Sequence, residues 1–207
     1  MGIERPIVTL SKKKYEGALS LPLLDFEYFT PKIDLDKYDA LIITSKEAVA
    51  ALGYLNWQDK KVYCVGEATA KLIPKVAYSQ KSGGAQELVQ YLKINAKEEK
   101  LLYCRAQEVS VDIAELIVCD EVILYRSFCK ELPNGTLPDN AIIIFSSPST
   151  IQCFLQRFTF KMTYSAIALG KTTQDALKNA TITSKLSPST AISDAIEYAK
   201  SVRQMQW

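Results

Sequence analysis

The chain carries a strand–glycine–helix pattern twice. Residues 62–70 (VYCVGEATA) form a short apolar run, a glycine turn at Gly66 and the beginning of a helix. Residues 166–173 (AIALGKTT) repeat the pattern, with Gly170 lying 104 residues after Gly66. Three further pairs keep nearly the same offset and order: Thr69 with Thr173, Ser45 with Ser147, and Ser82 with Ser187. These landmarks predict a duplicated unit of domain size. Known solenoid repeats are far shorter, so no solenoid is implied.

Strands and helices are expected to alternate along the whole chain. Residues 40–44 and 141–145 are continuous apolar runs, which are typical of strands covered on both faces. Alternation of this kind predicts α/β layers with parallel sheets and right-handed crossovers. The expected strands are residues 6–10, 23–29, 40–44, 62–65, 100–104, 121–128, 141–145, 166–169 and 181–183. The expected helices are residues 11–19, 47–52, 67–72, 85–92, 113–118, 151–158, 172–177 and 191–202.

Charge and composition exclude several classes of function. The net charge of +2 and the lack of a basic run argue against a nucleic-acid partner. The sequence has no histidine, so the commonest general base and metal ligand is missing. Ser-His-Asp and Cys-His catalysis are therefore excluded. We also expect no metal centre.

The five cysteines are widely spaced and contain no C-x-x-C pair. We interpret them as buried, reduced thiols of a cytoplasmic protein, and we expect neither a disulfide scaffold nor a zinc site. The N-terminal sequence lacks the pattern of a signal peptide, and no apolar run is long enough to span a bilayer. The chain is therefore expected to have no membrane partner.

Hydroxylic and small residues stand where predicted strands end and helices begin. Parallel sheets bind ligands at the carboxyl ends of their strands, where free N–H groups of helix starts point outward. The candidate N-caps are Ser45, Ser82, Ser147 and Ser187, and Thr69 and Thr173 lie in first turns. Together they suit an anion with several carboxylates or phosphates. Capping alone is the alternative explanation for any single serine. No G-x-G-x-x-G or Walker A pattern supports nucleotide binding.

These segments, taken in order, resemble the uroporphyrinogen-III synthase family. The resemblance rests on residues 40–49, 62–72, 82–92, 122–125, 144–149, 168–177 and 187–189, which cover nearly the whole chain. It implies an α/β fold of two similar flavodoxin-like, doubly wound parallel-sheet domains joined by a two-stranded β-ladder. One domain would combine residues 1–25 and 129–207, and the inserted domain would span residues 34–120. Residues 26–33 and 121–128 would form the ladder.

The resemblance also implies an activity. The family cyclises the linear tetrapyrrole hydroxymethylbilane to uroporphyrinogen III, with loss of water and inversion of ring D, as a cofactor-independent hydro-lyase of heme biosynthesis. The substrate would bind in an interdomain cleft. The partner would be this small molecule, and we expect a monomer with at most transient contact with the preceding pathway enzyme.

Residue roles follow from the same resemblance. Tyr125 would donate a hydrogen bond to the departing hydroxyl; the alternative is a tyrosine packed in a strand. The substrate-binding set would be Thr44, Ser45, Lys46, Gly66, Thr69, Ser82, Gly83, Arg105, Ser147 and Thr173. Arg105 is followed by Ala106, where the family usually has glycine. A solvated surface arginine is therefore the alternative for Arg105.

The sequence is also compatible with two other functional classes. The first is a two-domain protein that binds an anionic small molecule without catalysis, which would share the caps and the cleft. The second is a flavin- or nucleotide-binding α/β module, which a yellow or nucleotide-bound preparation would reveal.

Overall fold

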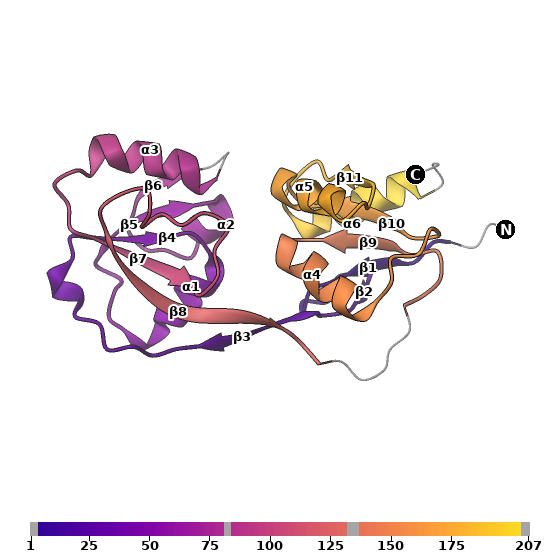
Figure 1. The fold of residues 1–207 in the computed structure, drawn as a ribbon, viewed down its shortest axis with the longest axis horizontal. Helices are drawn as coiled ribbons and strands as arrows, with labels where there is room; N and C mark the ends of the chain where they lie inside the picture. The colour runs from indigo at the N-terminus through magenta and orange to yellow at the C-terminus, as the bar shows by residue number, and fades with distance from the viewer. Residues whose placement is uncertain (1–3, 81–83, 132–136, 204–207) are drawn as a thin grey trace. The chain divides into compact units, whose positions relative to one another are not determined.

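The chain forms two compact units, each built around its own sheet (Figure 1). The computed structural model describes residues 4–80, 84–131 and 137–203. One unit comprises Met1–Asp25 and Phe128–Trp207, and the other comprises Phe26–Ser127. The chain passes from one unit to the other within two strands, β3 (Leu24–Tyr28) and β8 (Asp120–Cys129).

The sheet of the inserted unit has the strand order β3-β8-β7-β4-β5-β6. Its remaining strands are β4 (Ala40–Ile43), β5 (Lys61–Val65), β6 (Val76–Gln80) and β7 (Leu101–Ala106). The five strands from β8 to β6 are parallel. The β3 strand runs opposite to β8, since the Phe29 N–H donates to the Leu124 carbonyl while the Lys130 N–H donates to the Leu23 carbonyl.

Helices cover both faces of this sheet, as the apolar side chains on both faces require (Figure 1). On one face lie α1 (Lys46–Ala51), its 3-10 continuation η2 (Leu52–Tyr54) and α2 (Glu67–Ala70). On the other face lies α3 (Ala85–Asn95). A short 3-10 helix, η1 (Leu35–Lys37), precedes β4.

The second sheet is entirely parallel, with the order β11-β10-β9-β1-β2. Its strands are β1 (Ile7–Thr9), β2 (Leu19–Ser20), β9 (Ile142–Phe145), β10 (Ser165–Ala168) and β11 (Ser184–Leu186). Helices α4 (Pro148–Arg157) and α5 (Lys171–Asn179) cover one face. Helix α6 (Ile192–Val202) covers the other. Both units are therefore doubly wound, as predicted.

The two sheets repeat one plan. The series β4-α1-β5-α2-β6-α3 corresponds to β9-α4-β10-α5-β11-α6, and the strand orders β6-β5-β4-β7-β8 and β11-β10-β9-β1-β2 match position by position. The β1 strand therefore occupies the position that β7 has in the other sheet. This equivalence confirms the duplication that the spacing of Gly66 and Gly170 predicts, and it explains why a strand precedes the first complete copy.

Several predicted elements differ from the structure. The helix expected at residues 11–19 is wrong: Gly17 has a φ of 76°, and the segment forms turns before β2. Residues 113–118 form only a turn, closed by bonds from the Leu116 and Ile117 N–H groups to the Ile113 carbonyl. The strand expected at residues 181–183 begins at Ser184, because Thr181 has a φ of 60°. Strand β6 was not predicted.

The prediction that all cysteines are reduced is also wrong. Cys129, the last residue of β8, forms a disulfide with Cys153 of α4, with their Cα atoms 5.2 Å apart. Both residues pack against the apolar cluster under α4 and α5. Cys64, Cys104 and Cys119 are free thiols. The spacing of the cysteines along the chain does not predict this disulfide, because the two residues meet only when the end of β8 packs against α4.

In the described part of the chain, no helix combines the length and the apolar character needed to cross a bilayer.

Candidate active site

The candidate residues of the inserted unit gather at the carboxyl edge of its sheet. Thr44, Ser45 and Lys46 directly follow β4, and Gly66 directly follows β5. Tyr125 lies on β8 opposite Ala106, the last residue of β7. Since the strands from β8 to β6 are parallel, these positions lie on the same edge, where open α/β sheets bind their ligands.

Tyr125 and Ser45 contact each other directly. The Tyr125 hydroxyl lies 2.8 Å from the Ser45 Oγ. The same Oγ accepts the Ala48 N–H at 3.0 Å, so Ser45 is the N-cap of α1, as predicted. The Tyr125 side chain is packed as well: it is only 7% exposed and its ring meets Phe26 edge-on, with centroids 6.0 Å apart. Tyr125 thus combines a ring in the core with a hydroxyl at the sheet edge.

The surroundings of Tyr125 keep its phenol neutral. Burial raises the pKa of Tyr125, the hydrogen bond with Ser45 lowers it, and the negative charge of Glu47 raises it; the net direction is upward. A tyrosine already ionises near pH 10 when unperturbed. The hydroxyl therefore carries its proton at neutral pH and can donate a hydrogen bond.

Two further residues at this edge, Tyr28 and Glu47, were not predicted. Tyr28 of β3 donates a hydrogen bond from its hydroxyl to the Glu47 Oε2 in the first turn of α1, and its ring centroid lies 6.4 Å from that of Tyr125. The alternation of residues in the 23–29 run and the nearness of Glu47 to Ser45 in sequence were the available signals. Neither reveals that β3 meets α1.

Gly66 begins α2 without a side-chain cap. Its φ of 85° favours glycine, and the N–H groups of Thr69 and Ala70 both donate to its carbonyl. Thr69 is only 5% exposed, so its contribution to a ligand would come through packing of the helix start. Lys46 is exposed at the beginning of α1. Ser82 and Gly83 lie outside the described residues.

The other unit presents equivalent helix starts. Ser147 caps α4, as predicted: its Oγ accepts the Thr150 N–H at 3.3 Å, and its own N–H donates to the Thr150 Oγ1 at 3.2 Å. Gly170 begins α5 without a side-chain cap, and Thr173 is buried in the first turn. Ser45 thus corresponds to Ser147, and Gly66 to Gly170.

The predicted cap at Ser187 is wrong. Helix α6 begins only after Ala191, and Ser187 lies before it with its backbone N–H bonded to the Ala168 carbonyl. Its hydroxyl is buried and has no hydrogen-bond partner within the described residues. The sequence Ser-Pro favours a helix start locally, but here the chain first completes the edge of the sheet.

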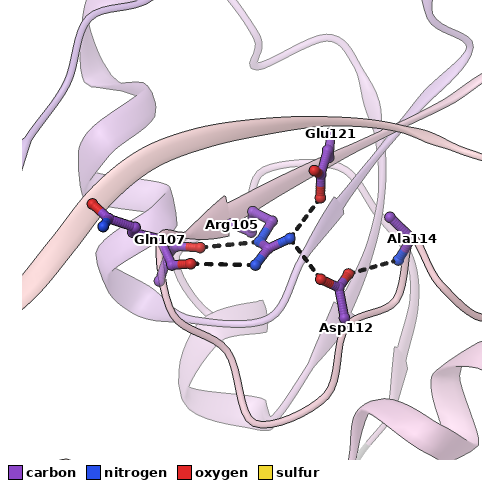
Figure 2. Close-up of polar contacts among 6 residues, drawn as sticks. Arg105, Gln107, Asp112, Ala114 and Glu121 are labelled. Atoms are coloured by element: carbon purple, nitrogen blue, oxygen red, sulfur yellow. Dashed lines mark hydrogen bonds and ion pairs between the residues drawn. The ribbon is translucent and has the colours of Figure 1, made fainter.

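Arg105 lies in a network of internal contacts (Figure 2). Its Nη1 contacts the Asp112 Oδ2 at 2.8 Å and the Glu121 Oε2 at 2.6 Å. Its Nε donates to the Ala106 carbonyl and its Nη2 to the Gln107 carbonyl. The side chain is only 10% exposed, which contradicts the alternative of a solvated surface arginine.

Substrate binding by Arg105 stays a prediction. The internal contacts of its guanidinium limit how such binding could occur. A substrate carboxylate would have to replace Asp112 or Glu121 at the guanidinium. Glu121 could not be paired with Arg105 from the sequence, because the contact depends on the register in which β8 lies beside β7.

No metal centre is evident in the parts of the chain that the structure describes, since they contain no group of three or more His, Cys, Asp or Glu side chains arranged to hold an ion.

Comparison with known proteins points to one family. The chain matches the family described as uroporphyrinogen-III synthase HemD over residues 7–196. Its fold is similar to that of uroporphyrinogen-III synthetase from Helicobacter pylori, with 25% identity, a TM-score of 0.79, and coverage of 96% of this chain and 100% of the other. A mutant uroporphyrinogen III synthase from the extremely thermophilic bacterium Thermus thermophilus has a TM-score of 0.63 at 9% identity, covering 98% and 100%, and supports the fold alone. A comparison with curated protein sequences gave no match.

Proposed function

This chain belongs to the uroporphyrinogen-III synthase family, and we propose from this that it converts hydroxymethylbilane to uroporphyrinogen III. The family is a cofactor-independent, cyclising hydro-lyase. The Tyr125–Ser45 contact supports assigning a role to particular residues, because the Tyr125 hydroxyl meets the N-cap of α1 where the parallel strands β7 and β4 end.

In the proposed reaction, Tyr125 assists departure of the terminal hydroxyl. The lone pair of the adjacent pyrrole nitrogen breaks the carbon–oxygen bond, and the Tyr125 proton passes to the leaving oxygen, which departs as water. The resulting azafulvene is attacked by the substituted α-carbon of ring D, which gives a spiro intermediate. The older bond from this carbon to the neighbouring ring then breaks, and that ring bonds to the other α-carbon of ring D, so that ring D is inverted. The proton released at final closure returns to the phenol, so the net change is loss of one water.

Substrate carboxylates would be held mainly by backbone N–H groups. Gly66 and Gly170 begin helices without capping side chains. The Thr69 and Ala70 N–H groups already donate to the Gly66 carbonyl, so anions would be bound by the N–H groups of the first two residues of each helix. Lys46 and Ser147 would add side-chain contacts at neighbouring helix starts. Thr69 and Thr173 are buried and would shape these starts. Positioning of this kind suits a reaction whose difficulty is to fold the substrate correctly.

The finer parts of the proposal concern the state of the protein in the cell. We propose a cytoplasmic monomer that meets the enzyme supplying its substrate only transiently. Analytical ultracentrifugation, alone and with that enzyme, tests both statements about association.

A product assay tests the function directly. Freshly prepared hydroxymethylbilane is incubated with the protein, the products are oxidised, and the type I and type III isomers are separated. We expect type III to predominate, while heat-denatured protein gives type I from spontaneous closure. EDTA should leave the rate unchanged. If only type I forms with folded protein, or if EDTA abolishes type III formation and zinc restores it, the proposal fails.

A further inference from the structure

The first turn of α1 makes side-chain hydrogen bonds with two neighbouring strands, β8 and β3. Ser45, its N-cap, contacts Tyr125 of β8, and Glu47, two residues later, accepts the hydroxyl of Tyr28 from β3. Two polar contacts thus link the beginning of α1 to this pair of strands. The helix start cannot shift along the strands without breaking one of them.

The two tyrosines also contact each other. Their ring centroids lie 6.4 Å apart with the planes tilted by 47°, and Tyr28 is 47% exposed whereas Tyr125 is almost completely buried. Tyr28 therefore covers one side of the Tyr125 ring, while Phe26 packs against it edge-on. Through the Tyr28–Glu47 bond, this cover is fixed to the same helix turn that holds the Tyr125 hydroxyl.

The Tyr125 and Ser45 hydroxyls each carry one hydrogen, which limits how the two groups can bond. Tyr125 and Ser45 share one hydrogen bond, in which either oxygen can be the donor. Ser45 already accepts the Ala48 N–H, so donation from Ser45 to Tyr125 satisfies its hydroxyl. The phenol hydrogen is then left to point towards a reacting oxygen. This arrangement depends on the position of the Ser45 Oγ, and hence on where the first turn of α1 lies.

The charge of Glu47 also acts on Tyr125 and helps to keep its phenol protonated. Glu47 is the carboxylate whose charge raises the pKa of Tyr125, after the larger effect of burial and against the effect of Ser45. Ionisable groups in the described residues that also neighbour Tyr125 include Tyr28 on β3 and Tyr103 on β7, both phenols.

We propose that Glu47 and Tyr28 together form a positioning pair that holds Ser45 and Tyr125 in the alignment required for loss of the substrate hydroxyl. This inference rests on the proposed function and adds two residues to it. Neither side chain needs to touch the reacting atoms, because both act through the first turn of α1.

The test is a set of variants assayed for turnover, KM and isomer ratio well below their unfolding temperatures. Tyr28→Phe keeps the ring and removes the hydroxyl, and Glu47→Ala removes the acceptor. Each should lower kcat by roughly tenfold, as expected for a small misplacement of a reacting group, with KM changed less than about twofold. The double variant should be no slower than either single variant, since both break the same link. Glu47→Gln should restore most of the turnover, because its amide oxygen can still accept the Tyr28 hydroxyl.

Glu27→Ala is the matched control. It removes a half-exposed carboxylate of β3 that pairs with Arg126 of β8, a link between the same two strands that does not involve Ser45 or Glu47. Turnover should stay close to wild type in this variant. Wild-type kcat in both Tyr28→Phe and Glu47→Ala would overturn the inference, as would additive losses in the double variant. A lower unfolding temperature without a lower kcat would show a purely structural contact and would also overturn it.

The outcomes for the two proposals are separable. Formation of type III isomer by the wild-type protein tests the proposed function, whatever the variants do. A slow Tyr125→Phe enzyme combined with fast Tyr28→Phe and Glu47→Ala enzymes would reject only the positioning pair.

Discussion

Gly66 and Gly170 begin equivalent helices with different backbone conformations. Gly66 has a φ of 85°, in the region that favours glycine, whereas Gly170 has a φ of −149°, which any residue adopts. Apart from the adjoining residues, no heavy atom of the described chain lies within 4 Å of a Cβ built at either position. The two copies of the motif therefore share a glycine for different reasons: only Gly66 requires it for the backbone.

Alanine substitutions should separate these two glycines. Gly66→Ala forces a side chain into the left-handed region and should lower the free energy of unfolding by roughly 1–2 kcal/mol. Gly170→Ala should cause no loss and can gain up to about 1 kcal/mol through the unfolded state. Chemical denaturation of both variants measures the difference. Equal destabilisation would contradict the conformational argument.

Removing the phenol hydroxyl of Tyr125 should affect the chemical step. We expect Tyr125→Phe to lower turnover by roughly ten- to a thousandfold, the range for one lost acid contact or transition-state hydrogen bond. KM should change much less, since contacts with the carboxylates remain. Tyr38→Phe is the control, because Tyr38 bonds Asp120 at the opposite end of β8. Turnover at the wild-type rate in a folded Tyr125→Phe variant would remove Tyr125 from the mechanism.

The Cys129–Cys153 disulfide should stabilise its unit. The bridge spans 24 residues, and closing a loop of this size removes unfolded-state entropy worth about 3 kcal/mol. The free energy of unfolding of the Cys129→Ala/Cys153→Ala variant should fall by this amount. Cys119→Ala is the control, because it removes a cysteine that is not part of the bridge. Alkylation of the unreduced, denatured protein, followed by mass spectrometry, should count three free thiols, matching Cys64, Cys104 and Cys119. Five modified cysteines would show that the bridge does not form.

The network around Arg105 should contribute more to stability than to substrate affinity. Arg105→Lys keeps the charge but loses the forked geometry that reaches Glu121, Asp112 and two carbonyls, so we expect a loss of about 1–2 kcal/mol. Arg126→Lys is the matched control in an exposed pair with Glu27 and should cost about 0.5 kcal/mol or less. KM should stay within about twofold in both. A large rise in KM with unchanged stability would instead indicate that Arg105 binds substrate.

Burial should protect the Cys104 thiol from alkylation. Desolvation raises its pKa to about 12, so only on the order of one molecule in ten thousand carries the thiolate at pH 8. Iodoacetamide should therefore leave Cys104 unmodified in the folded protein at that pH, and reaction should accelerate as the pH rises. Peptide mapping measures the modification. Rapid labelling at pH 8 would mean that the thiol is accessible or that the strand opens.

The sequence predicts local features of this fold better than contacts between distant residues. Ser45 and Ser147 were found as caps because capping depends on neighbouring residues, and both N-caps are confirmed. Strand β6 was missed because its residues are mostly half-buried or exposed and show no strong apolar run. The disulfide and the partners of Arg105 depend on strand register and packing, which no short pattern encodes. The Tyr28–Glu47 hydrogen bond could not be predicted for the same reason, because it depends on how β3 packs beside α1.

The position of β1 has a consequence for how the chain folds as it is synthesised. This strand lies between β2 and β9, and β9 begins only at Ile142. All the strands of the inserted sheet are complete by Cys129, so that sheet can assemble on the ribosome while β1 still lacks its neighbour. The N-terminal strand must therefore wait, with one edge unpaired, until most of the protein has been translated. A chain that ends at residue 131 and has been released from the ribosome should leave the residues of β1 open to hydrogen exchange, while those of β4 and β5 are already protected.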